Sequence, residues 1–213
     1  MRSEQIGLAQ LWLGDCREIA PSLPRPAAVI SDPPFGIGFA AQPTKWQRRA
    51  GATPEDWDDQ PGVAIETIRE MAEIQAVWGG NYFSLPPSRG WLSWFKPDAP
   101  PSMASFELCW TNRDQNARQV VQSISATNAE RVGHPTQKPL AVMRFTIDAV
   151  KVPAGGTILD PYMGSGSTGV AAVEMRHPFI GIEIDPGYFD VACRRIEAAQ
   201  RQGDMFRDLV GAA

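Results

Sequence analysis

The sequence predicts an α/β fold in which a mainly parallel β-sheet is covered by helices on both faces. Short apolar and β-branched runs alternate with helical patterns along the chain, which is the arrangement that parallel sheets require. Two of these runs end in motifs of acidic residues, prolines and glycines, as strands do at a ligand-binding edge. The 213 residues suit one domain. We expect it to span residues 1–202, followed by a frayed tail at 203–213.

Seven strands are predicted, each bounded by Gly, Pro or acidic residues. They cover residues 11–13, 27–31, 75–79, 91–95, 107–111, 157–160 and 179–184. Helical patterns lie at 63–74, 140–150, 168–175 and 186–201. Residues 41–62 are rich in Gln, Pro, Gly and Asp and are predicted to form a loop that moves over a substrate.

The tetrapeptide Asp32-Pro33-Pro34-Phe35 directly follows the predicted strand 27–31. Its prolines lack N–H donors and restrict φ, so nearby carbonyls are held in place as acceptors. Asp32 adds a charged acceptor and Phe35 an aromatic face, a combination suited to a flat heterocycle with an exocyclic amine. Adenine and cytosine both fit. The alternative is an Asp-Pro turn with Phe35 packed in the core.

A glycine loop at residues 157–169 joins another predicted strand to a helix. Gly164 and Gly166 allow close approach of the backbone to a ligand, although the third glycine of the dinucleotide fingerprint is missing. Glu183 ends the next predicted strand, about 20 residues on, where a ribose diol is bound in nucleotide-binding folds. The ligand is therefore expected to carry a ribose.

Together these motifs resemble the S-adenosylmethionine-dependent amino-methyltransferases of DNA, in the permuted β class and most like its small phage members. Asp32 to Phe35 resembles catalytic motif IV, residues 159–166 cofactor motif I, and residues 181–183 motif II. Gly14-Asp15-Cys16 is similar to motif III and residues 134–139 to motif X. Motif IV precedes motif I, as in the β class. The resemblance implies a Rossmann-like methyltransferase fold, with a seven-stranded mainly parallel sheet, one antiparallel strand, and motifs I and IV on adjacent strands.

The resemblance also implies a set of site residues. Catalysis is assigned to Asp32, Pro33, Pro34 and Phe35. The cofactor S-adenosylmethionine is assigned to Asp15, Cys16, His134, Thr136, Lys138, Asp160, Tyr162, Gly164, Ser165, Gly166, Thr168 and Glu183. Lys138 is expected near the methionine end, and for His134 the alternative is a loop histidine without chemistry. Asp at the head of motif IV favours the N6 of adenine, because relatives that act on cytosine N4 more often have Ser there; N4-cytosine stays open.

Double-stranded DNA is the expected partner, although the formal net charge is −4 and phosphate contacts need cations. Two basic clusters flank the motifs and are predicted to bind DNA: Lys45, Arg48 and Arg49, and Arg113, Arg118 and Arg131. Solvated loops are the alternative. The target-recognition segment of 112–133 is short for this family, so specificity is relaxed, comes from residues 41–62, or requires a second protomer in a homodimer. Phe95 stands where small relatives commonly have an acid.

Several other classes of protein are disfavoured. Cys16, Cys109 and Cys193 lie far apart, so neither a disulfide framework nor a metal site is expected. No apolar run is long enough for a membrane span and no secretory signal is visible, so a cytoplasmic location is expected. The alternatives left open are a non-catalytic DNA-binding module that keeps the cofactor fold, and a methyltransferase of glutamine side chains or RNA. A nicotinamide dehydrogenase fits poorly.

Overall fold

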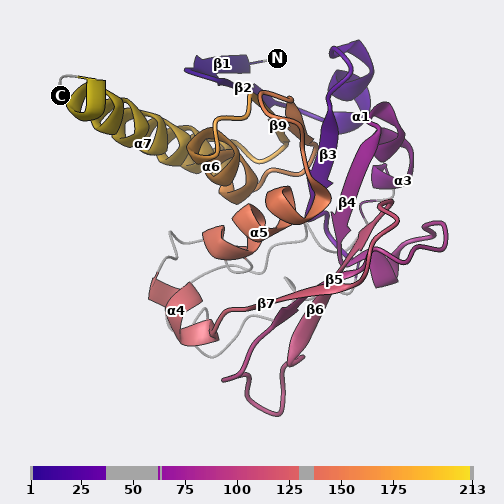
Figure 1. The fold of residues 1–213 in the computed structure, drawn as a ribbon. Coiled ribbons are helices and arrows are strands. Elements are labelled where there is room, and N and C mark those ends of the chain that lie inside the picture. Colours follow the sequence, from indigo (N-terminus) through magenta and orange to yellow (C-terminus); the bar gives the residue numbers. More distant parts are fainter. Residues whose placement is uncertain (1, 37–61, 63, 130–136, 212–213) are drawn as a thin grey trace.

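The computed structural model describes residues 2–36, 62, 64–129 and 137–211, which form one nine-stranded sheet with helices on both faces (Figure 1). The strand order is β1-β2-β9-β8-β3-β4-β6-β5-β7. The strands are β1 (Arg2–Ile6), β2 (Ala9–Leu13), β3 (Ala28–Ser31), β4 (Ile74–Trp78), β5 (Leu92–Phe95), β6 (Phe106–Thr111), β7 (Arg118–Val121), β8 (Ile158–Asp160) and β9 (Phe179–Glu183). All seven predicted strands are confirmed.

The prediction of seven strands with one antiparallel member was wrong in its count. Strands β1 and β7 were missed, and both β1 and β6 run antiparallel to the rest. Both missed strands lie at the edges of the sheet and are largely exposed. An edge strand with little burial lacks the apolar run or strict alternation that identifies a strand in sequence.

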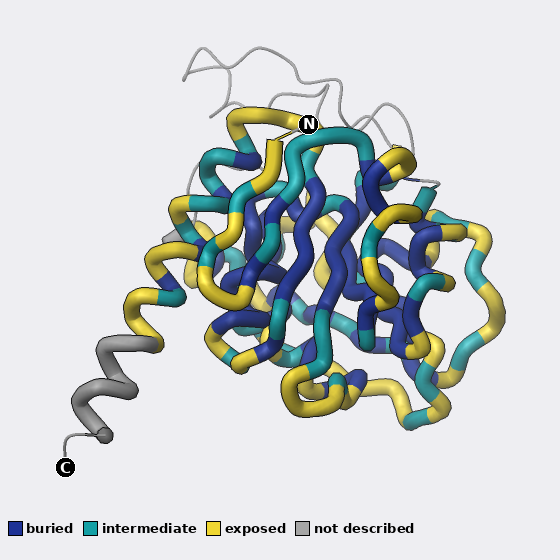
Figure 2. Tube along the Cα trace, turned by 90° about the horizontal axis from the view of Figure 1, so that it is seen from above, coloured by how far each residue is buried: buried dark blue, intermediate teal, exposed yellow. Residues whose placement is uncertain are grey.

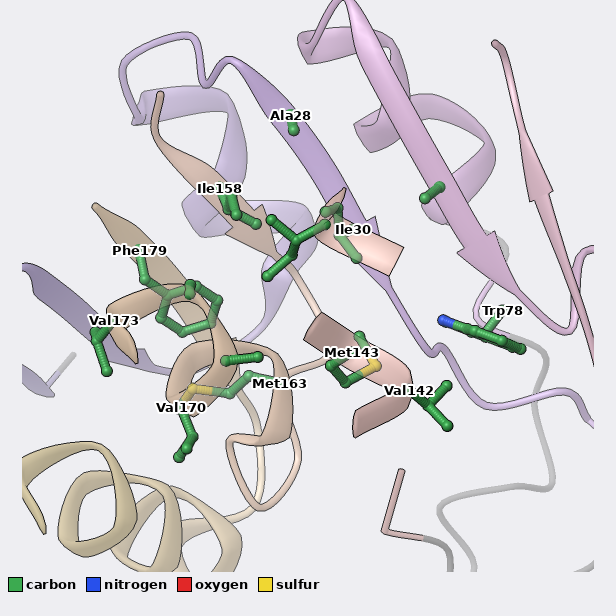
Figure 3. Packing of buried hydrophobic residues seen from close by; sticks show 14 of the residues in the cluster. Ala28, Ile30, Trp78, Val142, Met143, Ile158, Met163, Val170, Val173 and Phe179 are labelled. Atoms are coloured by element: carbon green, nitrogen blue, oxygen red, sulfur yellow. The ribbon is translucent and has the colours of Figure 1, made fainter. Parts of the chain in front are cut away.

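The two faces of the sheet carry separate apolar clusters, because successive strand side chains point to opposite faces. On one face, Ala28, Ile30 and Ile158 pack against α5 (Leu140–Val150), α6 (Ser167–Glu174) and α7 (Pro186–Gly211), as Figure 3 shows for part of the cluster. On the other, Val29 and Leu159 pack against α1 (Cys16–Ile19), the 3₁₀ turn Ala20–Ser22, and α3 (Ile65–Ile68). The central strands are accordingly buried when seen from above (Figure 2).

The helices differ from the prediction in three places. The predicted helix 63–74 is only α3 followed by the 3₁₀ turn Arg69–Met71, because Ala72 is extended and Ile74 begins β4. Helix α7 continues to Gly211, ten residues beyond the predicted end at 201; the glycine at 203 does not end it, because one glycine costs a helix only about 1 kcal/mol. Segment 112–133 contains β7 and α4 (Ile124–Ala129), which the sequence did not indicate.

Helix α5 has the bounds that were predicted, and α6 differs by one residue at each end. A further 3₁₀ turn, Gly80–Tyr82, follows β4. None of the described helices combines the length and the apolar character needed to cross a membrane.

Strands β3 and β8 lie side by side and parallel, with Val29 opposite Leu159. The Asp-Pro-Pro-Phe motif follows β3 and the glycine loop follows β8, so both leave the sheet at the carboxyl ends of neighbouring strands. The expectation that the two motifs lie on adjacent strands is confirmed. In open α/β sheets this edge is where ligands bind.

The turn from β8 into α6 depends on Gly166, which has a φ of +83°. A Cβ atom there would lie 2.9 Å from the Cβ of Ala192 on α7, which is closer than such atoms pack. The left-handed backbone and the contact with α7 therefore both require glycine at this position.

We predict that Gly166→Ala lowers the free energy of unfolding more than Gly155→Ala does. Gly155 has a similar φ of +71° but no heavy atom within 4 Å of an added Cβ. Both variants carry the backbone strain of about 1–2 kcal/mol, and only Gly166→Ala adds overpacking of about 1–3 kcal/mol. Urea denaturation measures both; equal losses would show that the packing against α7 has no energetic weight.

Candidate functional site

The carboxylate of Asp160, the last residue of β8, joins three parts of the site. Its Oδ1 accepts from Ser31 Oγ at 2.7 Å and from the backbone N of Tyr162 at 3.1 Å, and its Oδ2 accepts from Thr168 Oγ1 at 2.6 Å. The side chain is buried, which raises the pKa of Asp160 to about 6 against the opposing effect of the Thr168 and Ser31 hydrogen bonds. Asp160 and Thr168 thus connect β3, β8 and α6 from within the chain.

The glycine loop after β8 lies against Glu183 at the end of β9. Glu183 Oε2 accepts from the backbone N of Gly164 and Oε1 from that of Asp185, each at 2.8 Å. Gly164 and Gly166 both have positive φ. Burial raises the pKa of Glu183 to about 7, although the backbone hydrogen bonds lower it. The structure brings Glu183 and the loop together as the sequence suggested.

A cation from α7 supports the same loop. Arg195 Nη1 donates to the carbonyl of Ser165 at 2.6 Å, to Ser165 Oγ at 3.1 Å and to Ser167 Oγ at 3.3 Å. Arg195 was not predicted as a site residue, since an arginine in a mixed polar and apolar helix gives no signal of its distant partner. Arg195 therefore holds the glycine loop against α7.

The motif-III residues lie beside β9. Gly14 donates its backbone N–H to the carbonyl of Glu183 at 2.8 Å. Asp15 caps α1 through the N–H of Arg17 at 2.8 Å and also pairs with the Arg17 side chain, which lowers the pKa of Asp15. Cys16 is buried next to Tyr162, and burial raises the pKa of its thiol. His134 and Thr136 lie outside the described residues.

All three cysteines are free thiols, with Cys16 and Cys109 buried and Cys193 half-buried. Within residues 2–36, 62, 64–129 and 137–211, no group of three or more His, Cys, Asp or Glu side chains is placed to hold a metal ion.

The Asp-Pro-Pro-Phe segment presents acceptors and an aromatic ring at the end of β3. The carbonyl of Pro34 accepts from Gly62 N at 2.8 Å, whereas that of Pro33 has no hydrogen-bond partner among the described residues. Phe35 is half-buried and stacks on Tyr82, with ring centroids 4.9 Å apart and an interplanar angle of 13°. Phe35 is therefore not the core residue of the alternative interpretation.

Gly79 makes room for the Phe35 ring. It has a φ of +68°, and a Cβ there would lie 2.1 Å from a ring carbon of Phe35. Residue 79 joins β4 to the turn that carries Tyr82, so the end of β4 determines where both aromatic rings lie.

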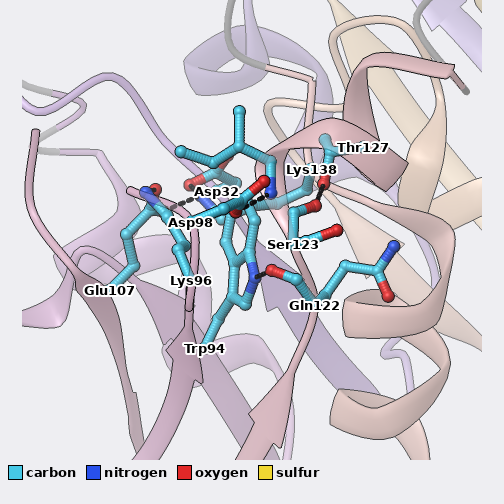
Figure 4. Close-up of polar contacts among 10 residues, drawn as sticks. Asp32, Trp94, Lys96, Asp98, Glu107, Gln122, Ser123, Thr127 and Lys138 are labelled. Atoms are coloured by element: carbon cyan, nitrogen blue, oxygen red, sulfur yellow. Dashed lines mark hydrogen bonds and ion pairs between the residues drawn. The ribbon is translucent and has the colours of Figure 1, made fainter. Parts of the chain in front are cut away.

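Lys138 lies beside the Asp-Pro-Pro-Phe motif. Its Nζ is 2.6 Å from Asp32 Oδ1 and 2.9 Å from Glu107 Oε2, and Glu107 Oε1 is also paired with Lys96 Nζ (Figure 4). The resemblance implies instead that Lys138 contacts the methionine end of the cofactor, which stays a prediction. Glu107 and Lys96 were not predicted as site residues. The sequence did offer one signal, since each is a charged residue beside apolar strand residues.

The charged states of these side chains support one another. Burial alone would raise the pKa of Glu107, but Lys138 and Lys96 bring it down to about 2. Burial would lower the pKa of Lys138, and Asp32 and Glu107 raise it above the ordinary value. Burial raises the pKa of Asp32, and Lys138 opposes that rise.

The predicted DNA-binding cations are only partly within the described residues. Lys45, Arg48, Arg49 and Arg131 lie outside them. Arg113 is half-buried just after β6. Arg118 begins β7 and contacts α5, where it pairs with Asp148 at 3.3 Å and lies 5.2 Å from the ring centroid of Phe145.

Parts of the sequence are similar to known proteins. The family model described as "DNA methylase" for N6- and N4-methyltransferases matches residues 65–194. The type II methyltransferase M.ScaI of Streptomyces caespitosus is 40% identical over 80 residues, which are 38% of this chain and 26% of that protein. The DNA adenine methyltransferase YhdJ of Escherichia coli (strain K12) is 43% identical over 70 residues, which are 33% of this chain and 24% of that protein. The matches thus span about a quarter of the length of these relatives.

Solved structures show the same fold. The M1.HpyAVI–SAM complex has a TM-score of 0.59 at 22% identity and covers 88% of this chain and 99% of its own. The cytosine-N4-specific PvuII DNA methyltransferase has a TM-score of 0.59 at 14% identity and covers 93% of each chain. Because the family model spans well over half of the sequence and includes the glycine loop and Glu183, the chain belongs to the DNA methylase family of N6-adenine and N4-cytosine methyltransferases.

Proposed function

We propose that the protein transfers a methyl group from S-adenosylmethionine to the exocyclic N6 of adenine in double-stranded DNA. The observation that carries this proposal is the hydrogen bond from Ser31 Oγ to Asp160 Oδ1 at 2.7 Å. It joins the residue before Asp32 to the residue that begins the glycine loop. The proposed amine acceptor and the proposed nucleoside-binding loop therefore lie next to each other, at the carboxyl ends of β3 and β8. Direct group transfer between two bound molecules requires such proximity.

The glycine loop and Glu183 are the proposed cofactor site. Gly164 and Gly166 bring the backbone close to the ligand, and the Glu183 carboxylate accepts hydrogen bonds from the ribose hydroxyls. When bound, S-adenosylmethionine supplies an activated methyl on a sulfonium. Asp160 contributes by holding the loop, since its oxygens are already engaged by Ser31, Thr168 and the N–H of Tyr162. Tyr162 and Cys16 of α1, which contact each other, are proposed to line the same site.

Asp32 and the Pro33 carbonyl are the proposed acceptors for the substrate amine. An aryl amine is a poor nucleophile because its lone pair is delocalised into the ring. Hydrogen bonds to Asp32 and Pro33 favour a more tetrahedral nitrogen and strengthen as positive charge develops on it. Transfer would form the N–C bond as the S–C bond breaks, with the sulfonium leaving as a neutral thioether, and the proton then lost from nitrogen would pass to the hydrogen-bonded Asp32 carboxylate. No covalent intermediate with the protein is needed.

The target base is proposed to leave the duplex and stack on Phe35. Base flipping costs a few kcal/mol, which contacts with the protein must offset. Adenine is preferred because Asp heads the motif, and the relative YhdJ is named an adenine methyltransferase. N4-cytosine is the second candidate, because a protein of the same fold is named cytosine-N4-specific.

Labelled methyl transfer to unmethylated duplex DNA tests the proposal, with the modified base identified by mass spectrometry. We expect N6-methyladenine from the native chain. We expect Asp32→Asn to lower kcat by about 10²-fold or more, because it removes the charge that stabilises the transition state, while cofactor binding persists. Asp190→Asn, at an exposed ion pair with Arg2, is the matched control and should retain full activity.

Two outcomes would contradict adenine methylation. N4-methylcytosine as the product would move the assignment to cytosine. Cofactor binding by the native chain without methylation of any DNA would favour the non-catalytic DNA-binding module, or an acceptor of another class such as RNA or glutamine side chains.

The affinity for S-adenosylmethionine is predicted to rise with pH. Ribose hydroxyls donate to the ionised form of Glu183, whose pKa in the free protein is about 7. Each pH unit below that value should therefore weaken binding by up to about tenfold. Glu183→Gln should bind more weakly and with a flat profile between pH 6 and 8. Calorimetric titration measures both; an unchanged slope in the variant would exclude Glu183 as the titrating group.

The stability of the free protein gives a second readout of the same group. Because the pKa of Glu183 is raised on folding from 4.5 to about 7, its contribution to stability is complete below about pH 4.5 and is lost as pH rises through 7. The loss amounts to roughly 3 kcal/mol at most. Glu183→Gln should remove this decline from the pH dependence of urea denaturation.

A further inference from the structure

Four buried or half-buried side chains of alternating charge form a continuous row next to the proposed acceptor: Lys96, Glu107, Lys138 and Asp32. We call it the charge row. We propose that Lys96, Glu107 and Lys138 are positioning residues for Asp32: the two lysines favour its ionised form, Glu107 holds both lysines in place, and Lys138 occupies one of the Asp32 oxygens. Asp32 then accepts hydrogen bonds from the substrate amine and does not act as its base before methyl transfer. The catalytic part rests on the proposed function.

The sheet register builds most of the row. Glu107 on β6 lies opposite Trp94 on β5, and Lys96 follows two residues later. Residues opposite each other, or two apart on one strand, point to the same face of a sheet. Lys96 therefore stands beside Glu107, with its Nζ 4.5 Å from the ring centroid of Trp94. Lys138 reaches the same face from the segment that enters α5 and completes the row (Figure 4).

The charge row has no net charge, which lowers the free-energy cost of burying it. The side chains of Lys96 and Lys138 are 6% and 7% exposed, and those of Asp32 and Glu107 are 23% and 26% exposed. Isolated charges are costly at such burial, and pairing offsets that cost only while every partner is present. Two ammonium groups and two carboxylates meet this condition. Loss of Lys138 would leave two carboxylates facing one remaining cation.

Lys138 gives the two oxygens of the Asp32 carboxylate different surroundings. Its Nζ contacts Oδ1 at 2.6 Å, and Oδ2 has no hydrogen-bond partner among the described residues. The ammonium is confined by aromatic rings, with Nζ 5.7 Å from the ring centroid of Phe35 and 5.4 Å from that of Trp78. The position of Lys138 thus directs Oδ2 to the side left for a substrate.

This arrangement determines the chemistry of Asp32. A buried carboxylate without a cation takes up a proton readily, and a protonated Asp32 would offer a donor where the amine needs an acceptor. The ammonium of Lys138 disfavours that proton. Two further titratable groups among the described residues interact electrostatically with Asp32: Asp160 at the end of β8 and the buried thiol of Cys109 on β6. Neither is a cation, so the row supplies the positive charge.

The test is a direct titration of Asp32 by ¹³C NMR of labelled aspartate carboxyls, with the signal assigned through Asp32→Asn. Lys138→Met should raise the pKa of Asp32 by about one unit or more and move the acid limb of the pH–rate profile upward. Adding Glu107→Gln to Lys138→Met should reverse part of that shift, because it removes the second carboxylate. Arg144→Met, which breaks a surface pair with Glu174, is the control and should change neither.

An unchanged Asp32 pKa in folded Lys138→Met would overturn the proposal. If circular dichroism shows that Lys138→Met does not fold, two milder variants decide. Lys138→Arg should keep the pKa near the native value, and Glu107→Gln should lower it, because Lys138 then has one carboxylate partner. If the pKa of Asp32 in Glu107→Gln equals the native value, the proposed role of the charge row is refuted. Absence of methyl transfer by the native chain would refute the proposed function alone, since the NMR titration does not depend on it.

Discussion

The site depends on the buried carboxylate of Asp160. Strand pairing places β3 beside β8, but it leaves the two segments beyond the strand ends free to diverge. Three hydrogen bonds to one carboxylate, from Ser31, Tyr162 and Thr168, remove that freedom. A buried polar network of this kind is rigid when it is fully satisfied. The acceptor motif, the glycine loop and the start of α6 therefore move as one unit.

The central part of the fold was predictable from sequence because its strands are buried. Residues 27–31 and 179–184 are apolar runs closed by acidic residues, and such runs identify strands without any knowledge of their neighbours. The edge strands β1 and β7 carry polar or mixed residues that pair on one side only, so local pattern does not reveal them. The predicted helix 63–74 failed for a related reason: an apolar segment of helical character passed directly into the buried strand β4.

Site residues could be predicted where a local sequence motif marks them. They could not be predicted where their role depends on contacts between segments that are distant in sequence. Asp32, Gly164 and Glu183 could be proposed as site residues because prolines, glycines and strand ends are visible along the chain. The partners of Lys138 were not predicted, because Glu107 lies 31 residues before it and the two meet only when the segment before α5 packs beside β6. Arg195 belongs to the same class, since its contact with Ser165 joins α7 to a loop that precedes it by 30 residues.

The neutrality of the charge row separates two kinds of electrostatics in the protein. Contacts with DNA phosphates release counterions and weaken steeply as salt is added. Screening acts mainly on exposed charges, and a buried row without net charge presents little field to the solvent ions. In the proposed function, the proton affinity of Asp32 would therefore be insulated from the ionic strength that governs encounter with DNA. The chemistry of the site would stay constant while the affinity for the duplex varies with salt.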